Sequence, residues 1–334
     1  MTGPLQPRPG AAHARILGVG GYRPSRVVTN DEICEQIDST DEWIRQRTGI
    51  ITRHFAAPDE TVVDMSAAAS EKAIAEAGLR ADQLDAVIVA TVTHLSQTPS
   101  AAAELAFRLG TKAPAAFDIS AACAGFSYGL TVAQDMIRGG SATHVLVVGV
   151  EKLSDMVDPT DRSVAFIFGD GAGAAVVGPS AEPGIGAVVW GSDGGQADAI
   201  RQDAFWTTLR DDPSHTFPSL KMKGPEVFRW AVYEMSKTAQ QALDAAGITG
   251  DQLDAFIPHQ ANMRITDAMI KQLGLPDTVA VARDIAETGN TSAASIPLAM
   301  SRMLESGEAK SGDLALLIGF GAGLVYSAQV VVLP

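Results

Sequence analysis

The chain has 334 residues, which is more than one ordinary hydrophobic core holds, so two domains or two halves are expected. Hydrophobic residues make up 46% of the chain and charged residues 19%, a composition typical of a compact soluble globule. The formal net charge of −14 argues against a nucleic-acid binder, and no apolar run approaches the ~18 residues of a membrane-spanning helix.

The N-terminal segment differs from the rest of the chain. Met1–Gly10 is rich in Pro and Gly and lacks an apolar signal core, so residues 1–12 are predicted to form a disordered tail rather than a targeting peptide. The two cysteines, Cys34 and Cys123, give no disulfide framework and predict a cytoplasmic protein. Cys34 lies between charged residues of a predicted helix and is interpreted as a packing residue.

Helices alternate with apolar strands along most of the chain. In the first half we predict helices over 64–77, 99–109 and 122–138 and strands over 85–93, 115–119 and 143–150. In the second half we predict helices over 225–246, 261–273 and 292–306 and strands over 254–258, 278–283 and 313–319. Gly169–Gly173 is predicted to be a tight turn into a strand over 174–177, and residues 185–222 are predicted to be surface excursions.

The chain contains an internal repeat. Residues 73–88 (AIAEAGLRADQLDAVI) align with residues 242–257 (ALDAAGITGDQLDAFI), and residues 141–150 align with residues 311–320 at nearly the same offset. Chance similarity of Ala-rich helices is the alternative, but the shared Asp-Gln-Leu-Asp-Ala and the steady offset favour one duplicated unit.

The duplication predicts the fold class. Two α/β units, each with a sheet covered on both faces, predict an α/β protein with a layered α/β/α/β/α arrangement. We place the N-terminal half at residues 13–180 and the C-terminal half at residues 181–334.

Cys123 is the first candidate for chemistry. It lies in a turn of small residues between a predicted strand and a predicted helix. A thiol at a helix N-terminus feels the positive end of the helix dipole and unpaired N–H groups, which favour the nucleophilic thiolate. The alternative is that Cys123 is a small buried hydrophobic residue.

His259 and Asn290 are the second and third candidates, because the repeat places them at matching turns. Asn290 aligns with Ser120, close to Cys123, and His259 directly follows a predicted strand. Sites in α/β sheets tend to form at the carboxyl ends of strands. The alternatives are a structural histidine and, for Asn290, a helix N-cap.

A glycine-rich segment, Gly319–Gly323, follows the last predicted helix and strand. As a dinucleotide-binding motif it is rejected, because Pro334 ends the chain before a βαβ unit could follow. A glycine-rich turn can instead present backbone N–H groups to an oxyanion.

Four motifs together resemble those of β-ketoacyl-ACP synthase III, a condensing enzyme of thiolase-like fold. The resemblance covers about Ala14 to Pro334, and the motifs are Ala122-Cys123-Ala124-Gly125-Phe126, His259-Gln260-Ala261-Asn262, Gly289-Asn290-Thr291-Ser292-Ala293-Ala294-Ser295 and Gly319-Phe320-Gly321-Ala322-Gly323. It implies a thiolase-like fold and the synthesis of 3-ketoacyl-ACP, which starts fatty-acid synthesis.

The resemblance also implies a role for each motif. Cys123 would take an acyl group from acyl-CoA, and His259 and Asn290 would hold the thioester carbonyl of malonyl-ACP during decarboxylation. The backbone N–H groups of Cys123 and Ala322 would form the oxyanion hole for the second step. No cofactor or metal is implied. A degradative thiolase would carry a second cysteine near the C-terminal glycine turn, so its absence from the sequence favours condensation.

Matching positions suggest a CoA entrance. Trp43 and Arg162 resemble a pair that sandwiches adenine, and Arg47 is placed to meet phosphate. Phe228 resembles a wall of the pantetheine tunnel. Core packing is the alternative for Trp43 and Phe228.

The partners implied are acyl-CoA, acyl carrier protein and a second copy of the chain, with no nucleic acid and no membrane. Arg264 and Lys271, on the helix after His259, are candidates for a basic patch that binds the acidic carrier protein. An ordinary solvated helix face is the alternative.

Two residues depart from the family pattern. Pro225 stands where many members have Asn, which puts a pantetheine contact in doubt because Pro offers no side-chain hydrogen bond. Thr98 stands where acetyl-specific members carry a Phe that reaches across the dimer to close the acyl pocket. The smaller Thr98 predicts a primer pocket that accepts more than acetyl.

Other functions stay open. The same chemistry could prime a polyketide or another specialised pathway. Cys, His and Asn in this order also suit a cysteine hydrolase, although the duplicated α/β pattern argues against one. A catalytically silent scaffold subunit is a further alternative, against which the presence of Cys123 argues.

Overall fold

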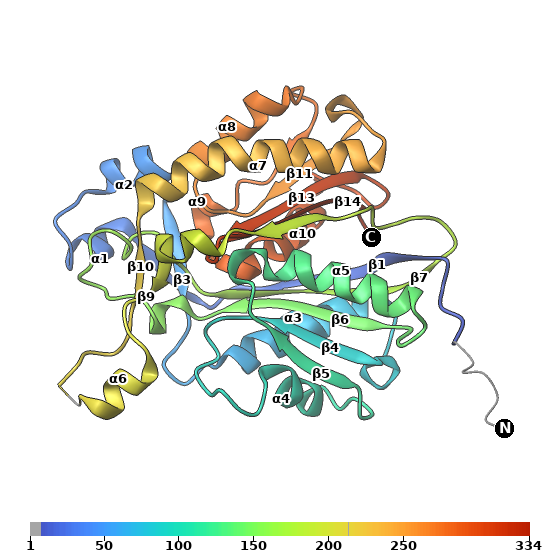
Figure 1. The fold of residues 1–334 in the computed structure, drawn as a ribbon, viewed down its shortest axis with the longest axis horizontal. Coiled ribbons are helices and arrows are strands. Elements are labelled where there is room, and N and C mark those ends of the chain that lie inside the picture. The colour runs from blue at the N-terminus through green and yellow to red at the C-terminus, as the bar shows by residue number, and fades with distance from the viewer. Residues whose placement is uncertain (1–7, 213) are drawn as a thin grey trace.

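Two five-stranded mixed sheets form the framework of the molecule (Figure 1). The computed structural model describes residues 8–212 and 214–334. The first sheet contains β1 (His13–Tyr22), β7 (Gly171–Ser180), β6 (Val145–Glu151), β4 (Ala86–Ala90) and β5 (Ala115–Ile119), in that spatial order. The second contains β8 (Val189–Ser192), β14 (Val325–Val332), β13 (Leu314–Gly321), β11 (Ala255–Pro258) and β12 (Ala280–Val281), in that spatial order.

The two sheets have the same topology. In each sheet, the strand that comes first in the chain (β1 or β8) lies at one edge and pairs with the strand that comes last (β7 or β14). The strand that comes third (β5 or β12) lies at the other edge. β4 is parallel to β5 and β6, and β11 is parallel to β12 and β13. β7 and β14 are antiparallel to both of their neighbours. This shared order confirms that the fold consists of two copies of one α/β unit.

Three layers of helices cover the sheets (Figure 1). α5 (Gly125–Arg138) and α10 (Ser295–Ser306) lie between the two sheets. The outer face of the first sheet carries α3 (Val62–Glu76) and α4 (Ala101–Arg108), and that of the second carries α7 (Gly224–Ala246) and α8 (Met263–Leu273). The predicted α/β/α/β/α arrangement is therefore confirmed.

The strand sequences explain why both faces of each sheet are covered. In β4 the side chains of Val87 and Val89 pack into the cluster beneath α3, whereas Ile88 packs into the cluster around α5 and α10. Successive side chains of a strand point to opposite faces. An apolar run without alternation therefore needs a helix layer on each side.

Smaller elements surround one end of the two sheets. They are β2 (Arg26–Thr29), β3 (Thr52–Phe55), α1 (Asn30–Cys34), α2 (Asp41–Thr48), β9 (Ile200–Gln202), α6 (Trp206–Asp211), β10 (Leu220–Met222) and α9 (Ile285–Thr288). Ile37, Ile44 and Phe166 belong to a small apolar cluster among these elements, against which the partly buried Cys34 packs. Cys34 is therefore a packing residue, as its sequence context predicts.

Three predictions about elements need correction. Residues 185–222 are more than surface excursions, because β8 pairs with β14 and completes the second sheet as β1 completes the first. β8 has four residues and only half-buried and exposed positions, which is why its sequence pattern is weak. The strand predicted over 278–283 is reduced to the two residues of β12.

The third correction concerns the glycines of the 169–173 segment. Gly171 and Gly173 lie within β7 instead of in a turn before it. A Cβ on Gly173 would lie 2.7 Å from the backbone N of Leu298, and one on Gly171 would lie 2.9 Å from the Leu298 side chain. These glycines therefore let α10 approach the strand closely.

The predicted tail falls mostly outside the described residues, which begin at residue 8. Just before β1, the backbone N of Ala11 donates a hydrogen bond to Ile137 O at 3.2 Å. β7 ends at Ser180, and the division of the chain between residues 180 and 181 stays a proposal.

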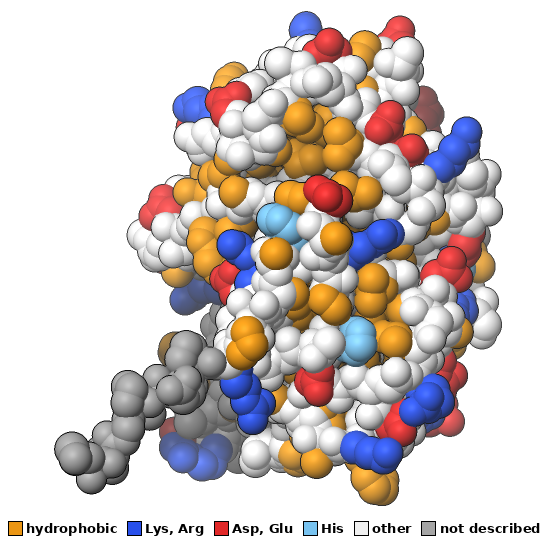
Figure 2. Space-filling model, turned by 90° about the vertical axis from the view of Figure 1, so that its right-hand side faces the viewer, with side chains coloured by type: hydrophobic (Ala, Val, Ile, Leu, Met, Phe, Trp, Pro, Cys, Tyr) orange, Lys and Arg blue, Asp and Glu red, His pale blue; other side chains and the backbone are white. Residues whose placement is uncertain are grey.

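The surface carries charges of both signs. On the face drawn in Figure 2, Lys and Arg side chains are interspersed with Asp and Glu side chains around small apolar clusters. Among the described residues, no helix combines the length and the apolar character that spanning a bilayer requires.

Candidate active site

A cavity of about 870 Å³ lies where the two halves meet, and it brings together the three main candidates. Cys123, His259 and Asn290 all line it, as does Ala322. These four residues come from separate turns of the chain, and the packing of the two halves brings them to one cavity.

Cys123 lies in a 3₁₀ turn, η2 (Ala122–Ala124), directly before α5. The residue is half-buried at the cavity wall. Burial raises the pKa of its thiol to about 12, with the nearby Glu151 charge adding to the increase and a hydrogen bond from Ser292 opposing it. Desolvation of the thiol therefore opposes the effect expected of the helix N-terminus, which favours the thiolate.

The glycine-rich segment lies directly against the thiol. Gly319 and Gly321 are the last glycines of β13, and the turn begins at Ala322. A Cβ on Gly321 would lie 2.9 Å from Cys123 Sγ, and one on Gly319 would lie 2.9 Å from the Cα of Ala124. The absence of side chains here is what allows the turn to approach the nucleophile.

His259 follows β11 and is 2% exposed. Its Nδ1 lies 2.7 Å from Ser295 Oγ, and its backbone N donates to Ile318 O at 2.7 Å. Burial lowers the pKa of the imidazole to about 3, so the ring is neutral at pH 7. With Nδ1 engaged by Ser295, Nε2 is the ring nitrogen available to the cavity.

Asn290 is held by both its backbone and its side chain. Its backbone N donates to Ile167 O at 2.9 Å, and its O accepts from Gly169 N at 3.0 Å. Its Oδ1 accepts from Ser292 N at 2.8 Å, at the start of the 3₁₀ turn η6 (Ser292–Ala294), whose N-cap residue is Thr291. This hydrogen bond occupies only the amide oxygen. The amide Nδ2 is left as a donor at the cavity.

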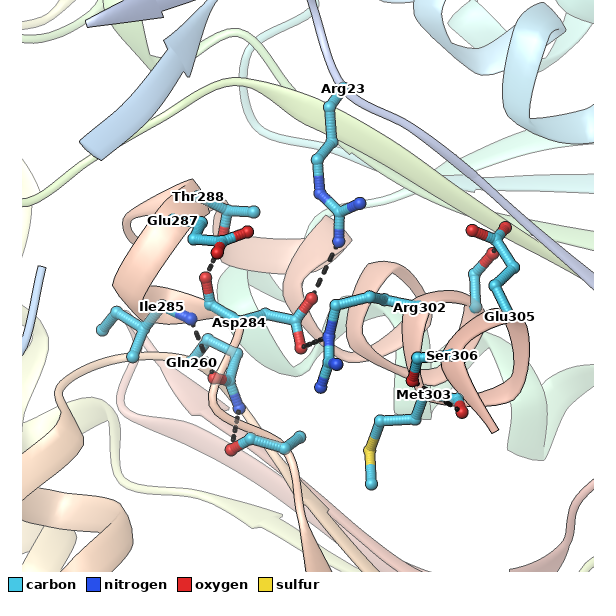
Figure 3. Close-up of polar contacts among 12 residues, drawn as sticks. Arg23, Gln260, Asp284, Ile285, Glu287, Thr288, Arg302, Met303, Glu305 and Ser306 are labelled. Carbon is cyan, nitrogen blue, oxygen red and sulfur yellow. Dashed lines mark hydrogen bonds and ion pairs between the residues drawn. The ribbon is translucent and has the colours of Figure 1, made fainter. Parts of the chain in front are cut away.

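Residues that sequence reasoning missed hold the segment before Asn290 (Figure 3). Gln260 is buried, its Oε1 accepts from Ile285 N at 3.1 Å, and its Nε2 donates to Pro258 O at 2.8 Å. The Asp284 carboxylate accepts from Arg23 at 2.8 Å and from Arg302 at 2.9 Å. Gln260 thus links the His259 turn to α9, and α9 leads into Asn290.

The CoA candidates gather at the mouth of the cavity. The guanidinium carbons of Arg47 and Arg162 each lie 5.7 Å from the centre of the Trp43 ring, a distance at which cations stack on indole. Trp43, Arg47 and Phe228 line the cavity. Trp43 also packs edge-on against Phe166 at 5.3 Å, so its packing and ring-stacking interpretations are compatible.

Four further residues differ in their positions relative to the cavity. Arg264 lines the cavity with its guanidinium 5.1 Å from the Phe228 ring, whereas Lys271, seven positions further along α8, is exposed and away from the lining. Thr98 is exposed and outside the cavity of its own chain, although the neighbouring Ser96 lines it. Pro225 lies in the first turn of α7 and lines the cavity.

The fold and the cavity define a condensing enzyme of thiolase-like fold. The family model described as 3-oxoacyl-(acyl-carrier-protein, ACP) synthase III matches residues 117–194, and the model of its C-terminal part matches residues 243–333. The chain belongs to this family, which is also called β-ketoacyl-ACP synthase III.

Relatives and solved structures agree with this assignment. The chain is 63% identical over 330 residues to the β-ketoacyl-ACP synthase III of Streptomyces glaucescens, covering 99% of each chain. It is 58% identical over 325 residues to the mycobacterial β-ketoacyl-ACP synthase III of Mycobacterium marinum, covering 97% of each. The priming β-ketosynthase of the R1128 polyketide pathway superposes with a TM-score of 0.97 at 48% identity, covering 99% of each chain. The synthase III of Aquifex aeolicus superposes with a TM-score of 0.88 at 39% identity, covering 96% of this chain and 99% of the other.

Proposed function

We propose that this protein is a β-ketoacyl-ACP synthase III. It transfers an acyl primer from acyl-CoA to Cys123 and condenses it with malonyl-ACP, giving 3-ketoacyl-ACP, CoA and CO₂. The observation that carries this proposal is that Cys123, His259 and Asn290 line one cavity from separate turns of the two halves.

In the first step the Cys123 sulfur attacks the thioester carbonyl of acyl-CoA, and CoA leaves as its thiolate. The carbonyl oxygen becomes an oxyanion in the tetrahedral intermediate. The backbone N–H groups of Cys123 and Ala322 are the proposed donors to it, and the close approach of Gly321 to the thiol supports this role.

In the second step the carboxylate of malonyl-ACP leaves as CO₂, and its electron pair forms an enolate at the thioester carbonyl. His259 Nε2 and Asn290 Nδ2 are the proposed donors to that enolate oxygen. A neutral histidine suits this task because it stabilises the oxyanion without transferring a proton to it, and the lowered pKa of His259 supports this role. The enolate carbon then attacks the acyl-Cys123 thioester.

The mouth of the cavity fits a nucleotide and a phosphopantetheine arm. Trp43 and Arg162 are proposed to sandwich adenine, Arg47 to meet phosphate and Phe228 to form a tunnel wall. Pro225 leaves that part of the tunnel without a side-chain hydrogen bond. No cofactor takes part in this scheme, because a thiol and hydrogen-bond donors suffice for each step.

Acyl carrier protein is the proposed macromolecular partner. Arg264 and Lys271 are seven residues apart on α8, so they lie on the same side of the helix, and Arg264 lines the cavity. We also propose a cytoplasmic homodimer that binds neither nucleic acid nor membrane.

A second candidate function is the priming of a polyketide or another specialised pathway by the same chemistry. The similarity to the R1128 priming β-ketosynthase favours it. Both functions use the same residues, so they differ only in the primer and the carrier protein.

Intact-mass measurement after incubation with a panel of acyl-CoAs tests the proposal. We expect a one-acyl adduct on the native protein, none on Cys123→Ala, and conversion of malonyl-ACP to 3-ketoacyl-ACP by the acylated enzyme. Failure to form an adduct with any acyl-CoA would refute the synthase and favour a scaffold or a hydrolase. Comparison of fatty-acid and polyketide carrier proteins would separate the two pathways.

A further inference from the structure

A carboxylic acid lies buried beside the candidate nucleophile and has no role in the proposed function. Glu151 is the last residue of β6 and is 0% exposed. Acidic side chains are almost never fully buried unless they are paired, because burial removes their hydration. The described residues supply hydrogen-bond donors to Glu151 rather than an ion pair.

The hydrogen bonds to Glu151 are unevenly divided between its two oxygens. Oε2 accepts from Thr91 Oγ1 at 3.2 Å, from Val92 N at 3.0 Å and from Thr93 Oγ1 at 2.7 Å. Oε1 accepts from Ser292 Oγ alone among the described residues, at 3.1 Å. Three donors occupy the lone pairs of Oε2. If the group becomes protonated, the proton therefore has its place on Oε1, facing Ser292.

Ser292 connects this acid to the thiol. It lines the same cavity as Cys123, and the turns that hold the two residues, η2 and η6, lie against each other. Its backbone is fixed at φ 48° and by the bond from its N to Asn290 Oδ1. A hydroxyl group has one proton to donate and two lone pairs, so Ser292 can donate to whichever neighbour is the anion and accept from the other.

We propose that Glu151 accepts the proton of the Cys123 thiol through the Ser292 hydroxyl during acylation and returns it during condensation. The inference rests on the proposed function and assigns its missing proton acceptor. In this proposal Ser292 exchanges the proton with the reacting sulfur, and Glu151 acts through Ser292.

The proton and bond changes balance over the two steps. During acylation, Sγ forms its bond to the acyl carbon and gives its proton to Ser292 Oγ, which passes its own proton to Glu151 Oε1. The carbon–sulfur bond of acyl-CoA breaks, and the CoA thiolate takes a proton from solvent. During condensation, the enolate carbon displaces Sγ as a thiolate, and the proton returns from Oε1 through Ser292 to Sγ. Over the full cycle one solvent proton is consumed, by CoA.

The electrostatics of the site support this assignment. Burial raises the pKa of Glu151 to about 7, against the opposing hydrogen bonds of Thr93, Val92, Ser292 and Thr91. A proton acceptor with a pKa near the working pH is well matched to general base catalysis. With its pKa lowered to about 3, the neutral imidazole of His259 is a much weaker base.

The Cys123 thiol is the main titratable neighbour of Glu151, because the nearby lysine charge is directed elsewhere. The Glu151 charge acts on Cys123 from the end of β6. Lys152 follows Glu151 in the chain, but its Nζ bonds Ala57 O at 3.0 Å and lies 3.4 Å from Asp155. The lysine charge is therefore directed away from the carboxylate.

Acylation rates measured in single turnover from pH 5.5 to 9 test the proposal. For the native enzyme we expect the rate to rise with pH and to level off above about pH 7. In Glu151→Gln the amide oxygen can still accept hydrogen bonds from the groups around Oε2, and the amide N–H can donate to Ser292. The amide cannot take up a proton in this pH range. We expect it to acylate about 100-fold more slowly at pH 7, with a rate that rises with pH and does not level off.

Ser292→Ala is the second variant, because it removes the connection and leaves Glu151 and its other three hydrogen bonds in place. We expect the same loss of the plateau. Asp170→Asn is the matched control: Asp170 is also buried, but its carboxylate bonds Ser154 and Ala56, so its variant should keep the native pH profile.

The outcomes separate the possible failures. A native enzyme that forms no acyl adduct would refute the proposed function itself. A native enzyme that acylates normally while Glu151→Gln and Ser292→Ala keep its plateau, at any overall rate, would overturn the proton transfer and leave the function standing. If Glu151→Gln does not fold, the profile of Ser292→Ala decides alone.

Discussion

Ala122 and Ser292 lie at equivalent positions of the two halves and share the same left-handed backbone conformation, with φ of 44° and 48°. Neither is glycine, so each carries a strain on the order of 1 kcal/mol or more. Each opens a 3₁₀ turn, η2 or η6, that leads into a helix of the central layer, and the two turns lie against each other. Among the described residues, two of the three non-glycine residues with positive φ thus lie where the proposed nucleophile and its supporting groups meet, and the third is Ala113.

The close approach of β13 to the thiol predicts that Gly321→Ala lowers acylation. The added Cβ would lie 2.9 Å from Sγ, Cβ and N of Cys123, so the turn or the nucleophile must move. We expect the rate of acylation to fall about 100-fold, because displacing reacting groups by about 1 Å has an effect of that size on the rate. Gly194→Ala is the control, since its Cβ would meet open space. Native acylation by Gly321→Ala would contradict this account.

The buried ion pairs of Asp284 predict that Asp284→Asn slows condensation more than acylation. Asp284 is 1% exposed at its side chain, whereas Arg23 and Arg302 are 29% and 25% exposed and can be rehydrated. We expect a loss of roughly 2–3 kcal/mol in the free energy of unfolding, below the effect at a fully buried pair. Condensation should fall more than acylation, because α9 leads to Asn290 and not to Cys123. Equal losses in both half-reactions would argue against a positioning role. Asp82→Asn is the control, because it removes ion pairs with the exposed Arg80 and Lys112.

The stacked pair at the cavity mouth predicts a specific defect in Arg162→Ala. Loss of the guanidinium from the Trp43 ring should raise KM for acyl-CoA about 3- to 10-fold and leave kcat unchanged. An acyl-pantetheine substrate, which has no adenine, should show no change. Arg210→Ala, which removes an arginine that pairs with Asp211, should behave like the native enzyme. A KM that rises equally for both substrates would place adenine elsewhere.

Thr98 predicts the range of primers. If a second chain closes the acyl pocket at this position, Thr98→Phe should keep acetyl-CoA as a substrate and reduce kcat/KM for branched or longer primers by 10-fold or more. Steady-state rates with a panel of acyl-CoAs measure this, with acetyl-CoA as the internal control. The idea fails if native enzyme and variant rank the primers alike, or if the native enzyme binds nothing larger than acetyl-CoA.

The raised pKa of Glu151 predicts a pH dependence of stability. Its pKa is about 7 in the folded protein and 4.5 as its ordinary value, so between these pH values the folded chain binds more protons than the unfolded chain. Folding is then favoured by acid, and this contribution to stability falls as pH rises through that window, by up to about 3 kcal/mol. The free energy of unfolding of Glu151→Gln minus that of the native protein should rise from pH 4.5 to pH 7 and stay constant above pH 7. Urea unfolding at several pH values measures this, and a difference that is constant throughout would contradict it.

Much of the fold could be predicted from the sequence because its signals are local or repeated. The apolar runs of β4 and β6 mark strands covered on both faces, and the repeat gives the two halves their common order. The cavity lining by Cys123, His259 and Asn290 could be expected for the same reason, since each follows a strand or begins a helix.

Features that depend on packing between distant segments could not be predicted. Burial raises the pKa of Cys123, and the end of β13, almost 200 residues further along the chain, lies directly against the thiol. Gly171 resembles a turn residue until α10 is seen packed against its strand. Glu151 and Ser292 are 141 positions apart, and neither carries a motif that would pair them.

The two matching turns also show where the asymmetry of the molecule resides. In the second turn, Ala293 occupies the position that Cys123 holds in the first. The backbone of each half offers the same cradle for a reactive side chain, and the first half alone fills it with sulfur. The proposed division of labour, in which one half bears the acyl chain and the other handles the extender unit, would therefore depend on a few side chains of a shared scaffold.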